Sequence, residues 1–131
     1  MPQKTYYVES CIWLNLFKKE GDATKGIPSW KLAKDFLEDN NKIIVSTIAI
    51  KEISFKIPDK MDYVIKFFKD NDNIELIKTK PEDYDLARKF ETEDEFKISF
   101  YDYLHVAISK RLNIPLITRD NELIQFAKKH V

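Results

Sequence analysis

The chain has 131 residues, which suits one domain, and its 44% hydrophobic content is enough for a buried core. Lysine and arginine (22) balance aspartate and glutamate (22), and this zero net charge excludes bulk electrostatic attraction to nucleic acids or membranes. One cysteine, two histidines and two glycines exclude an internal disulfide, a multi-cysteine zinc site and a GxGxxG nucleotide-binding loop.

The first part of the chain alternates short β-rich runs with longer helical patterns. Thr5–Val8 predicts a strand, and a helix capped by Ser10 follows and ends near Gly21. A second helix over 30–37 has one apolar face. Ile43–Val45 predicts the next strand, and a helix from about Thr47 to Ile57 comes after it.

The rest of the chain continues this alternation. The predicted elements are helices at Tyr63–Phe68, Pro81–Phe90, 99–112 and 120–129, and strands at Ile74–Ile77 and Leu116–Thr118. Such alternation favours right-handed crossovers and a single α/β domain over 1–131. We expect a three-layer sandwich with a central, mostly parallel sheet of four or five strands flanked by helices. Ligands bind beyond the carboxyl ends of the strands in such sheets.

Four acidic residues fall where such a site is expected. Glu9 follows the first strand, and Glu52 lies on the helix after the second. Asp102 lies near the start of the helix that leads into the fourth strand, and Asp120 follows that strand. Gathered carboxylates repel one another unless a cation balances them. Mg²⁺ and Mn²⁺ are hard cations that take oxygen ligands, activate water and stabilise charge on a phosphodiester. The pattern therefore predicts a divalent metal site.

Each acid also has an alternative role. Asp120 could cap the last helix, and Asp102 has the spacing of a capping box. Glu9 could complement a helix dipole. Glu52 projects from an apolar helical face, where a lone acid is costly, and an ion pair with Lys56 four residues later is its alternative.

Three segments, YYVESCIWLNLF, VSTIAIKEI and FYDYLHVAISKRLNIPLITRD, together resemble the PIN domain family of VapC-type toxins and related ribonucleases. The resemblance covers nearly the whole chain. It implies an endoribonuclease that depends on Mg²⁺ or Mn²⁺ and hydrolyses RNA phosphodiesters, as the toxin of a toxin–antitoxin pair. The site residues it implies are catalytic Glu9, Glu52, Asp102 and Asp120, with Glu9, Asp102 and Asp120 as metal ligands and Ser10 and Thr118 in support.

The resemblance also implies partners. We expect an RNA substrate, a homodimer and a protein antitoxin. Arg119, Lys110 and Arg111 are candidates for contacts with the RNA backbone. The longest uncharged apolar stretch is too short to span a bilayer, and the first residues lack the apolar run of a signal peptide. We therefore expect a cytoplasmic protein.

The chain departs from the family pattern at Glu9, where aspartate is usual, and at Cys11, where asparagine or serine is common. The alternative function is a catalytically weak or inactive PIN-like module that binds RNA or protein. A receiver-like or phosphatase domain ranks lower because no DxD motif follows the first strand. His105 lies on an apolar helical face and is expected to be a core residue.

Overall fold

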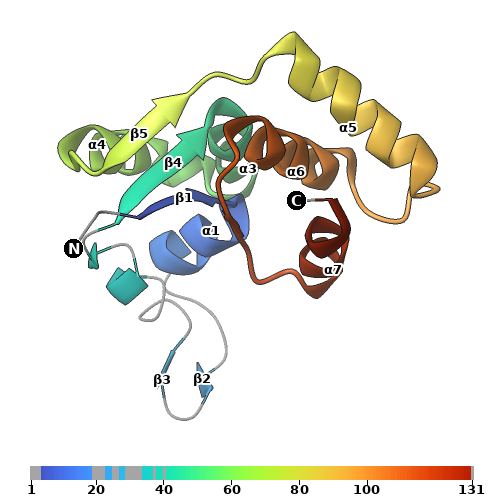
Figure 1. Cartoon of the computed structure of the whole chain (residues 1–131). Coiled ribbons are helices and arrows are strands. Elements are labelled where there is room, and N and C mark those ends of the chain that lie inside the picture. Colours follow the sequence, from blue (N-terminus) through green and yellow to red (C-terminus); the bar gives the residue numbers. More distant parts are fainter. Residues whose placement is uncertain are drawn as a thin grey trace.

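The computed structural model describes residues 4–18, 23–24, 27–28, 34–36, 38–39 and 41–130. Its central sheet has four parallel strands in the order β5-β4-β1-β6 (Figure 1). The strands are β1 (Thr5–Val8), β4 (Lys42–Ser46), β5 (Ile74–Ile77) and β6 (Leu116–Ile117). All four predicted strands are thus confirmed. Strand β6 ends one residue earlier than predicted, because Thr118 leaves the sheet.

A second, two-stranded ladder was not predicted from the sequence. Strands β2 (Ala23–Thr24) and β3 (Ile27–Pro28) pair antiparallel. The predicted helix over 30–37 lies mostly outside the described residues, including Trp30, Ala33 and Leu37, although residues 34–36 are helical.

The other predicted helices are confirmed, with small shifts at their ends. They are α1 (Ser10–Lys18), α3 (Thr47–Lys56), α4 (Met61–Asp70, after a 3₁₀ turn at Pro58–Lys60), α5 (Pro81–Glu93), α6 (Phe100–Leu112) and α7 (Asn121–His130). Ser46 and Ser99 cap the starts of α3 and α6 through their hydroxyl groups, which accept hydrogen bonds from Ala49 and Asp102 backbone N–H groups.

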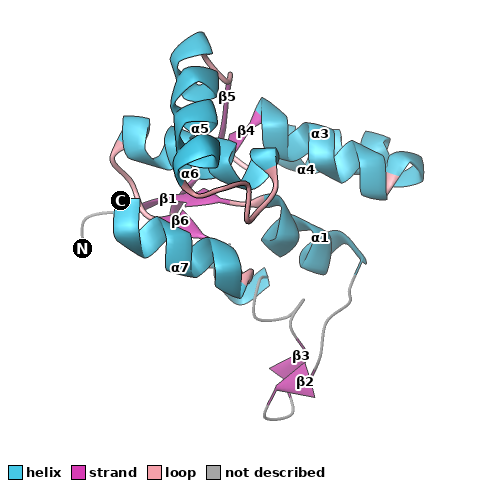
Figure 2. Ribbon diagram, turned by 90° about the vertical axis from the view of Figure 1, so that its right-hand side faces the viewer, coloured by secondary structure: helices cyan, strands magenta, loops and turns pink. Residues whose placement is uncertain are grey.

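Helices cover both faces of the sheet, which makes the molecule a three-layer sandwich (Figure 2). On one face, Val8 and Val45 pack with Trp13 of α1 and Phe68 of α4 in one apolar cluster. Neighbouring strand residues point the other way, so Tyr7 and Ile44 contact Ile108 of α6 on the opposite face. None of the described helices is both long and apolar enough to cross a membrane.

Candidate active site

The predicted site forms where β1 and β6 end side by side. The two strands are parallel and paired, so the residues that follow them, Glu9 and Thr118, emerge at the same edge. The Glu9 backbone N–H donates to the Ile117 carbonyl at 3.0 Å. The Thr118 hydroxyl donates to Glu9 Oε2 at 2.8 Å. Glu9 and Thr118, which are far apart in the sequence, are therefore hydrogen-bonded to each other at the ends of β1 and β6. We call this place the corner.

The Glu9 carboxylate is buried and held by three donors. Only 4% of Glu9 is exposed, and its Oε1 accepts bonds from the Ser10 hydroxyl (2.6 Å) and the Cys11 backbone N–H (3.2 Å). Burial acts to raise the pKa of Glu9, but the field of His105 and hydrogen bonds from Cys11, Ser10 and Thr118 outweigh it. The net pKa lies below its ordinary value, so Glu9 carries its charge at neutral pH.

Glu52 reaches the same corner from α3 and bonds to a histidine. Its Oε1 accepts a hydrogen bond from His105 Nε2 at 2.5 Å, and the predicted alternative, a pair with Lys56, is not formed between these two described residues. Glu9, Glu52 and His105 each offer a ligand atom, and these atoms lie within 4.8 Å of one another. The structure thus brings two of the four predicted acids together.

Sequence reasoning did not assign His105 to the site. The residue is fully buried, as expected for the core, yet its imidazole joins Tyr7 to Glu52. A signal was available in the sequence. His105 follows Asp102 by three residues on α6, and residues at that spacing share a helix face.

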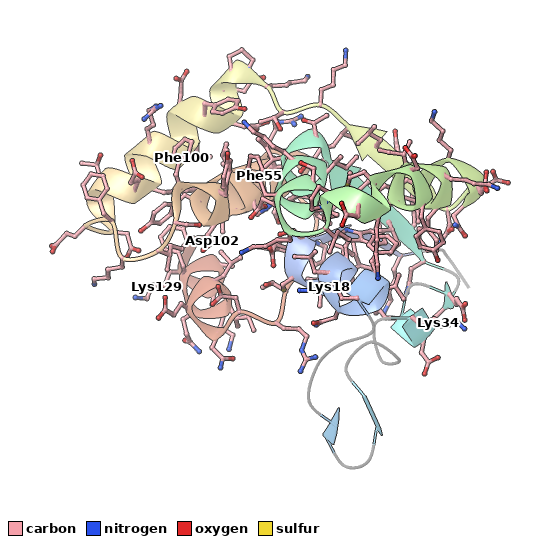
Figure 3. All side chains as sticks on the ribbon, turned by 180° about the vertical axis from the view of Figure 1, so that it is seen from behind. Lys18, Lys34, Phe55, Phe100, Asp102 and Lys129 are labelled. Carbon is pink, nitrogen blue, oxygen red and sulfur yellow. The ribbon has the colours of Figure 1, made fainter. Side chains whose placement is uncertain are left out.

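Asp102 lies in the first turn of α6 (Figure 3). The charges of Glu9 and Asp120 act on its carboxylate. Its pKa is raised from 3.8 to about 6, mainly by burial and also by the charges of Glu9 and Asp120, against smaller opposing effects of Ser99 and His105. Its backbone N–H also donates the capping bond to the Ser99 hydroxyl that the sequence allowed. Asp102 lies outside the tight group of three described above.

Asp120 is exposed and acts as a helix cap. Its Oδ1 accepts bonds from the Glu122 (3.0 Å) and Leu123 (3.3 Å) backbone N–H groups at the start of α7. The alternative role considered for this residue is therefore present. Among the described residues, the predicted metal ligands Glu9, Asp102 and Asp120 do not form a group as compact as that of Glu9, Glu52 and His105.

These residues fit a hard divalent cation. An ionised carboxylate offers about four acceptor positions, and Glu9 uses three of them. Glu52 uses only one oxygen in its bond to His105. Burial is the main cause of the raised pKa of Asp102, and the charges of Glu9 and Asp120 add to it, so a cation here would stabilise the ionised carboxylate. Oxygen donors and uncompensated negative charge are what Mg²⁺ or Mn²⁺ needs.

The three basic residues predicted to contact RNA differ in their surroundings. Arg119 is exposed next to Asp120. Lys110 is also exposed, but it follows Asp102 by eight residues on α6, a rise of about 12 Å. Arg111 donates two hydrogen bonds to the buried Asp83 at 2.7 and 3.0 Å, so its guanidinium is engaged in a structural ion pair.

Cys11 is packed against the same corner. Its Sγ lies 3.4 Å from the Thr118 hydroxyl and accepts a bond from the Arg119 backbone N–H at 3.3 Å. Burial and the neighbouring Glu9 charge raise the pKa of the thiol to about 12. The thiol is therefore neutral and unreactive at physiological pH, and its role is to pack and orient the loop after β6.

A pocket of about 680 Å³ lies between α1, α4 and β5, and none of the four acids lines it. Its apolar lining includes Leu16, Phe17, Tyr63, Phe67 and Ile74. We call this pocket the α1–α4 groove. Its lining suits an apolar partner better than a phosphate.

Comparisons with known proteins agree with the fold. The sequence matches the PIN domain family over residues 6–129. No curated protein matches it. Among solved structures, Mycobacterium tuberculosis VapC20, described as a sarcin-ricin loop cleaving toxin, aligns with a TM-score of 0.71 at 13% identity, covering 92% of this chain and 93% of that one.

Two further structures are similar. VapBC2 from Rickettsia felis, bound to a DNA fragment from its promoter, aligns with a TM-score of 0.67 at 17% identity, covering 93% of this chain and 92% of that one. FitAcB from Neisseria gonorrhoeae aligns with a TM-score of 0.65 at 12% identity, covering 94% of this chain and 93% of that one. At such identities the likeness shows a common fold.

Proposed function

The chain belongs to the PIN domain family, which it matches over residues 6–129, and on this premise we propose that it is a metal-dependent endoribonuclease and the toxin of a toxin–antitoxin pair. The observation that carries the proposal is the corner at the ends of β1 and β6. There a charged, buried Glu9 meets Glu52. The charges of Glu9 and Asp120 act on Asp102, and VapC20, which has a similar fold, is described as a sarcin-ricin loop cleaving toxin.

In this proposal, Glu9, Asp102 and Asp120 hold Mg²⁺ or Mn²⁺. When bound, the ion supplies positive charge and Lewis acidity beside the scissile phosphodiester. Ser10 and Thr118 keep the Glu9 carboxylate ionised and fixed in place. The pKa of Asp102, about 6, allows its carboxylate to ionise at neutral pH and serve as a ligand.

Glu52 orients the attacking water and takes its proton, using the oxygen that is not bonded to His105. The water oxygen bonds to phosphorus as the bond from phosphorus to the 3′-oxygen breaks. The products are a 5′-phosphate and, after the 3′-oxygen takes a proton from solvent, a 3′-hydroxyl. Arg119, exposed beside Asp120, is the best-placed contact for the RNA backbone. Lys110 and Arg111 are further from the acids.

The proposed partners follow from the same assignment. The chain would act in the cytoplasm as a homodimer and would be held inactive by a protein antitoxin. We assign an apolar segment of that antitoxin to the α1–α4 groove, where the Tyr63 side chain is exposed and apolar rings line the wall.

A second function is favoured by one observation. Glu9 has three donors and Glu52 has His105, so the corner is satisfied by hydrogen bonds from the protein alone. A site of this kind is compatible with a catalytically weak PIN-like module that binds RNA or protein. Turnover and metal binding distinguish the two functions.

The test uses the purified chain with RNA. We expect cleavage that EDTA stops and Mn²⁺ restores, because the acids need a cation to act together. Asp102→Asn should lower kcat by about 100-fold or more. It should also weaken the Mn²⁺ affinity measured by calorimetry, which does not depend on turnover.

Asp85→Asn is the matched control, since Asp85 is an exposed aspartate on α5 and is not one of the proposed site residues. It should leave both cleavage and Mn²⁺ binding unchanged. RNA cleavage that survives both EDTA and Asp102→Asn would refute the proposed mechanism. Mn²⁺ or RNA binding without turnover would favour the binding module.

A further inference from the structure

A chain of four hydrogen-bonded side chains runs through the core to Glu52. Ser46 Oγ lies 2.7 Å from the Tyr7 hydroxyl, which lies 2.5 Å from His105 Nδ1, and His105 Nε2 lies 2.5 Å from Glu52 Oε1. Ser46, Tyr7 and His105 are all fully buried. This series of hydrogen bonds connects β4, β1 and α6 to the Glu52 carboxylate on α3, which is the end of the series that reaches solvent.

The direction of these bonds follows from the donors and acceptors present. Ser46 Oγ already accepts the Ala49 backbone N–H at the cap of α3, so its own proton is free to go to the Tyr7 oxygen. The Tyr7 hydroxyl lies 2.5 Å from His105 Nδ1 and can donate its own proton there.

The remaining imidazole proton is then on Nε2 and points at Glu52. In this arrangement both ring nitrogens have hydrogen-bond partners, and no buried polar side-chain atom among the described residues lacks a partner. A hydrogen bond from Tyr7 to Nδ1 thus leaves a ring proton on Nε2, the nitrogen that faces the Glu52 carboxylate.

The bond restrains a side chain that would otherwise move. Glutamate has three rotatable side-chain bonds, and the Glu52 side chain is 20% exposed, so a hydrogen bond to its end restricts the rotamers that it can adopt. His105 holds one oxygen and leaves the other without a hydrogen bond among the described residues. One oxygen is therefore an anchor, and the second is available to a water molecule.

The anchor also ties the acids to one another. Tyr7 stands two residues before Glu9 on β1, and His105 stands three residues after Asp102 on α6. The elements that carry Glu9 and Asp102 therefore both contribute to the bond that fixes Glu52. A misplacement of about 1 Å at a reacting group can cost about 100-fold in rate.

We propose that His105 is a positioning residue that holds the Glu52 carboxylate in its working orientation through Nε2–H, with Tyr7 fixing the tautomer. This inference rests on the proposed nuclease function. His105 touches neither RNA nor the reacting atoms. Its effect passes entirely through Glu52.

Two amide substitutions separate the two nitrogens of the ring. The amide of glutamine reaches the place of Nε2 and can donate to Glu52, whereas the shorter asparagine reaches only the place of Nδ1. His105→Asn should lower kcat by about 100-fold with KM within about twofold of wild type. His105→Gln should restore kcat to within about tenfold of wild type.

Both variants put an amide in place of a buried ring, so thermal unfolding should show similar losses of stability for the two. Equal kcat values for His105→Gln and His105→Asn would overturn the inference. A change confined to KM would overturn it as well.

A measurement on the wild-type chain covers the case in which the variants do not fold. The ¹⁵N spectrum of the imidazole at neutral pH should show a proton on Nε2, and Glu52→Gln should shift that resonance. An unprotonated Nε2 would overturn the inference and leave the nuclease proposal intact. Wild-type protein that does not cleave RNA would refute the nuclease proposal, while the spectrum would still decide whether His105 holds Glu52.

Discussion

The extra methylene of Glu9, compared with the aspartate usual in the family, lets its carboxylate lie against the first turn of α1. There the Ser10 hydroxyl and the Cys11 backbone N–H bind one oxygen, while Thr118 binds the other. These bonds keep the group ionised although it is buried. The substitution is thus accommodated by the surrounding donors without loss of charge.

Asp102 should destabilise the fold at neutral pH in the absence of metal. Its pKa is about 6 in the folded protein and 3.8 ordinarily, so the folded state binds the proton more tightly than the unfolded chain. Stability therefore falls as the pH rises from about 4 to about 6, and the loss persists above that range. In EDTA at pH 8, Asp102→Asn should raise the free energy of unfolding by up to about 3 kcal/mol.

Urea unfolding at pH 8 and at about pH 4 measures this effect. The gain should shrink at the lower pH, where the wild-type carboxyl is protonated in the folded state and only partly ionised in the unfolded chain. Asp85→Asn, on an exposed face of α5, should change stability little at either pH. A gain from Asp102→Asn of equal size at both pH values would show that charge is not its cause.

The identities of the acids were readable from the sequence, but their partners were not. Glu9 and Thr118 could be expected to meet because both follow strands. The bond from His105 to Glu52 depends on how α6 packs over β1 and α3. Periodicity places His105 on an apolar face and says nothing of which polar group lies opposite.

At the scale of elements, the ion pair of Arg111 and Asp83 fixes α5 against α6. Asp83 is 1% exposed, and its carboxylate also accepts the Lys80 backbone N–H at 2.8 Å near the start of α5. Removing the cation would leave a buried carboxylate unpaired. Arg111→Met should therefore lower the free energy of unfolding by about 3 kcal/mol.

Chemical denaturation tests this value, with Lys110→Met as control, because Lys110 is an exposed neighbour on the same helix. The control should cost less than about 0.5 kcal/mol. If Arg111→Met left stability unchanged but weakened RNA cleavage, Arg111 would be an RNA contact and its structural role would be wrong.

Most helices and strands were predictable because local signals agreed with the fold. Ser99 caps α6 as expected, and Pro81 begins α5, whereas the predicted cap Ser10 is the first residue of α1. The end of α5 was placed too early, near Phe90, because no breaker marks it. The helix ends at Glu93, and the positive φ angles of Glu95 and Phe96 turn the chain. The β2–β3 ladder was missed because each strand has only two residues.

At the scale of the molecule, zero net charge gives no bulk electrostatic attraction to a partner. We therefore expect partners to bind through local surfaces such as the α1–α4 groove. Tyr63 is 60% exposed in the groove. Tyr63→Arg should therefore abolish co-purification with the antitoxin, which we expect to be encoded by an adjacent small gene, because the change puts a charge among apolar contacts. RNA cleavage by the isolated chain should be unchanged.

Tyr84→Arg serves as the control, because Tyr84 is a half-exposed tyrosine on α5 that does not line the groove. It should leave the complex intact. Co-purification that survives Tyr63→Arg would place the antitoxin elsewhere on the surface.

The three-layer class of the fold was predictable, but the strand order was not. Alternating strands and helices predict a parallel sheet, and the structure confirms it. That β1 lies between β4 and β6 depends on pairings across most of the chain, which local patterns do not encode.

The bond from Thr118 to Glu9 spans 109 positions of the chain. A chain that ends before β6 lacks the strand that pairs with β1 at this edge of the sheet. Such a fragment contains Glu9 and Glu52 but lacks Thr118 and Asp120. We therefore expect truncated chains that end before residue 118 to lack the proposed nuclease activity.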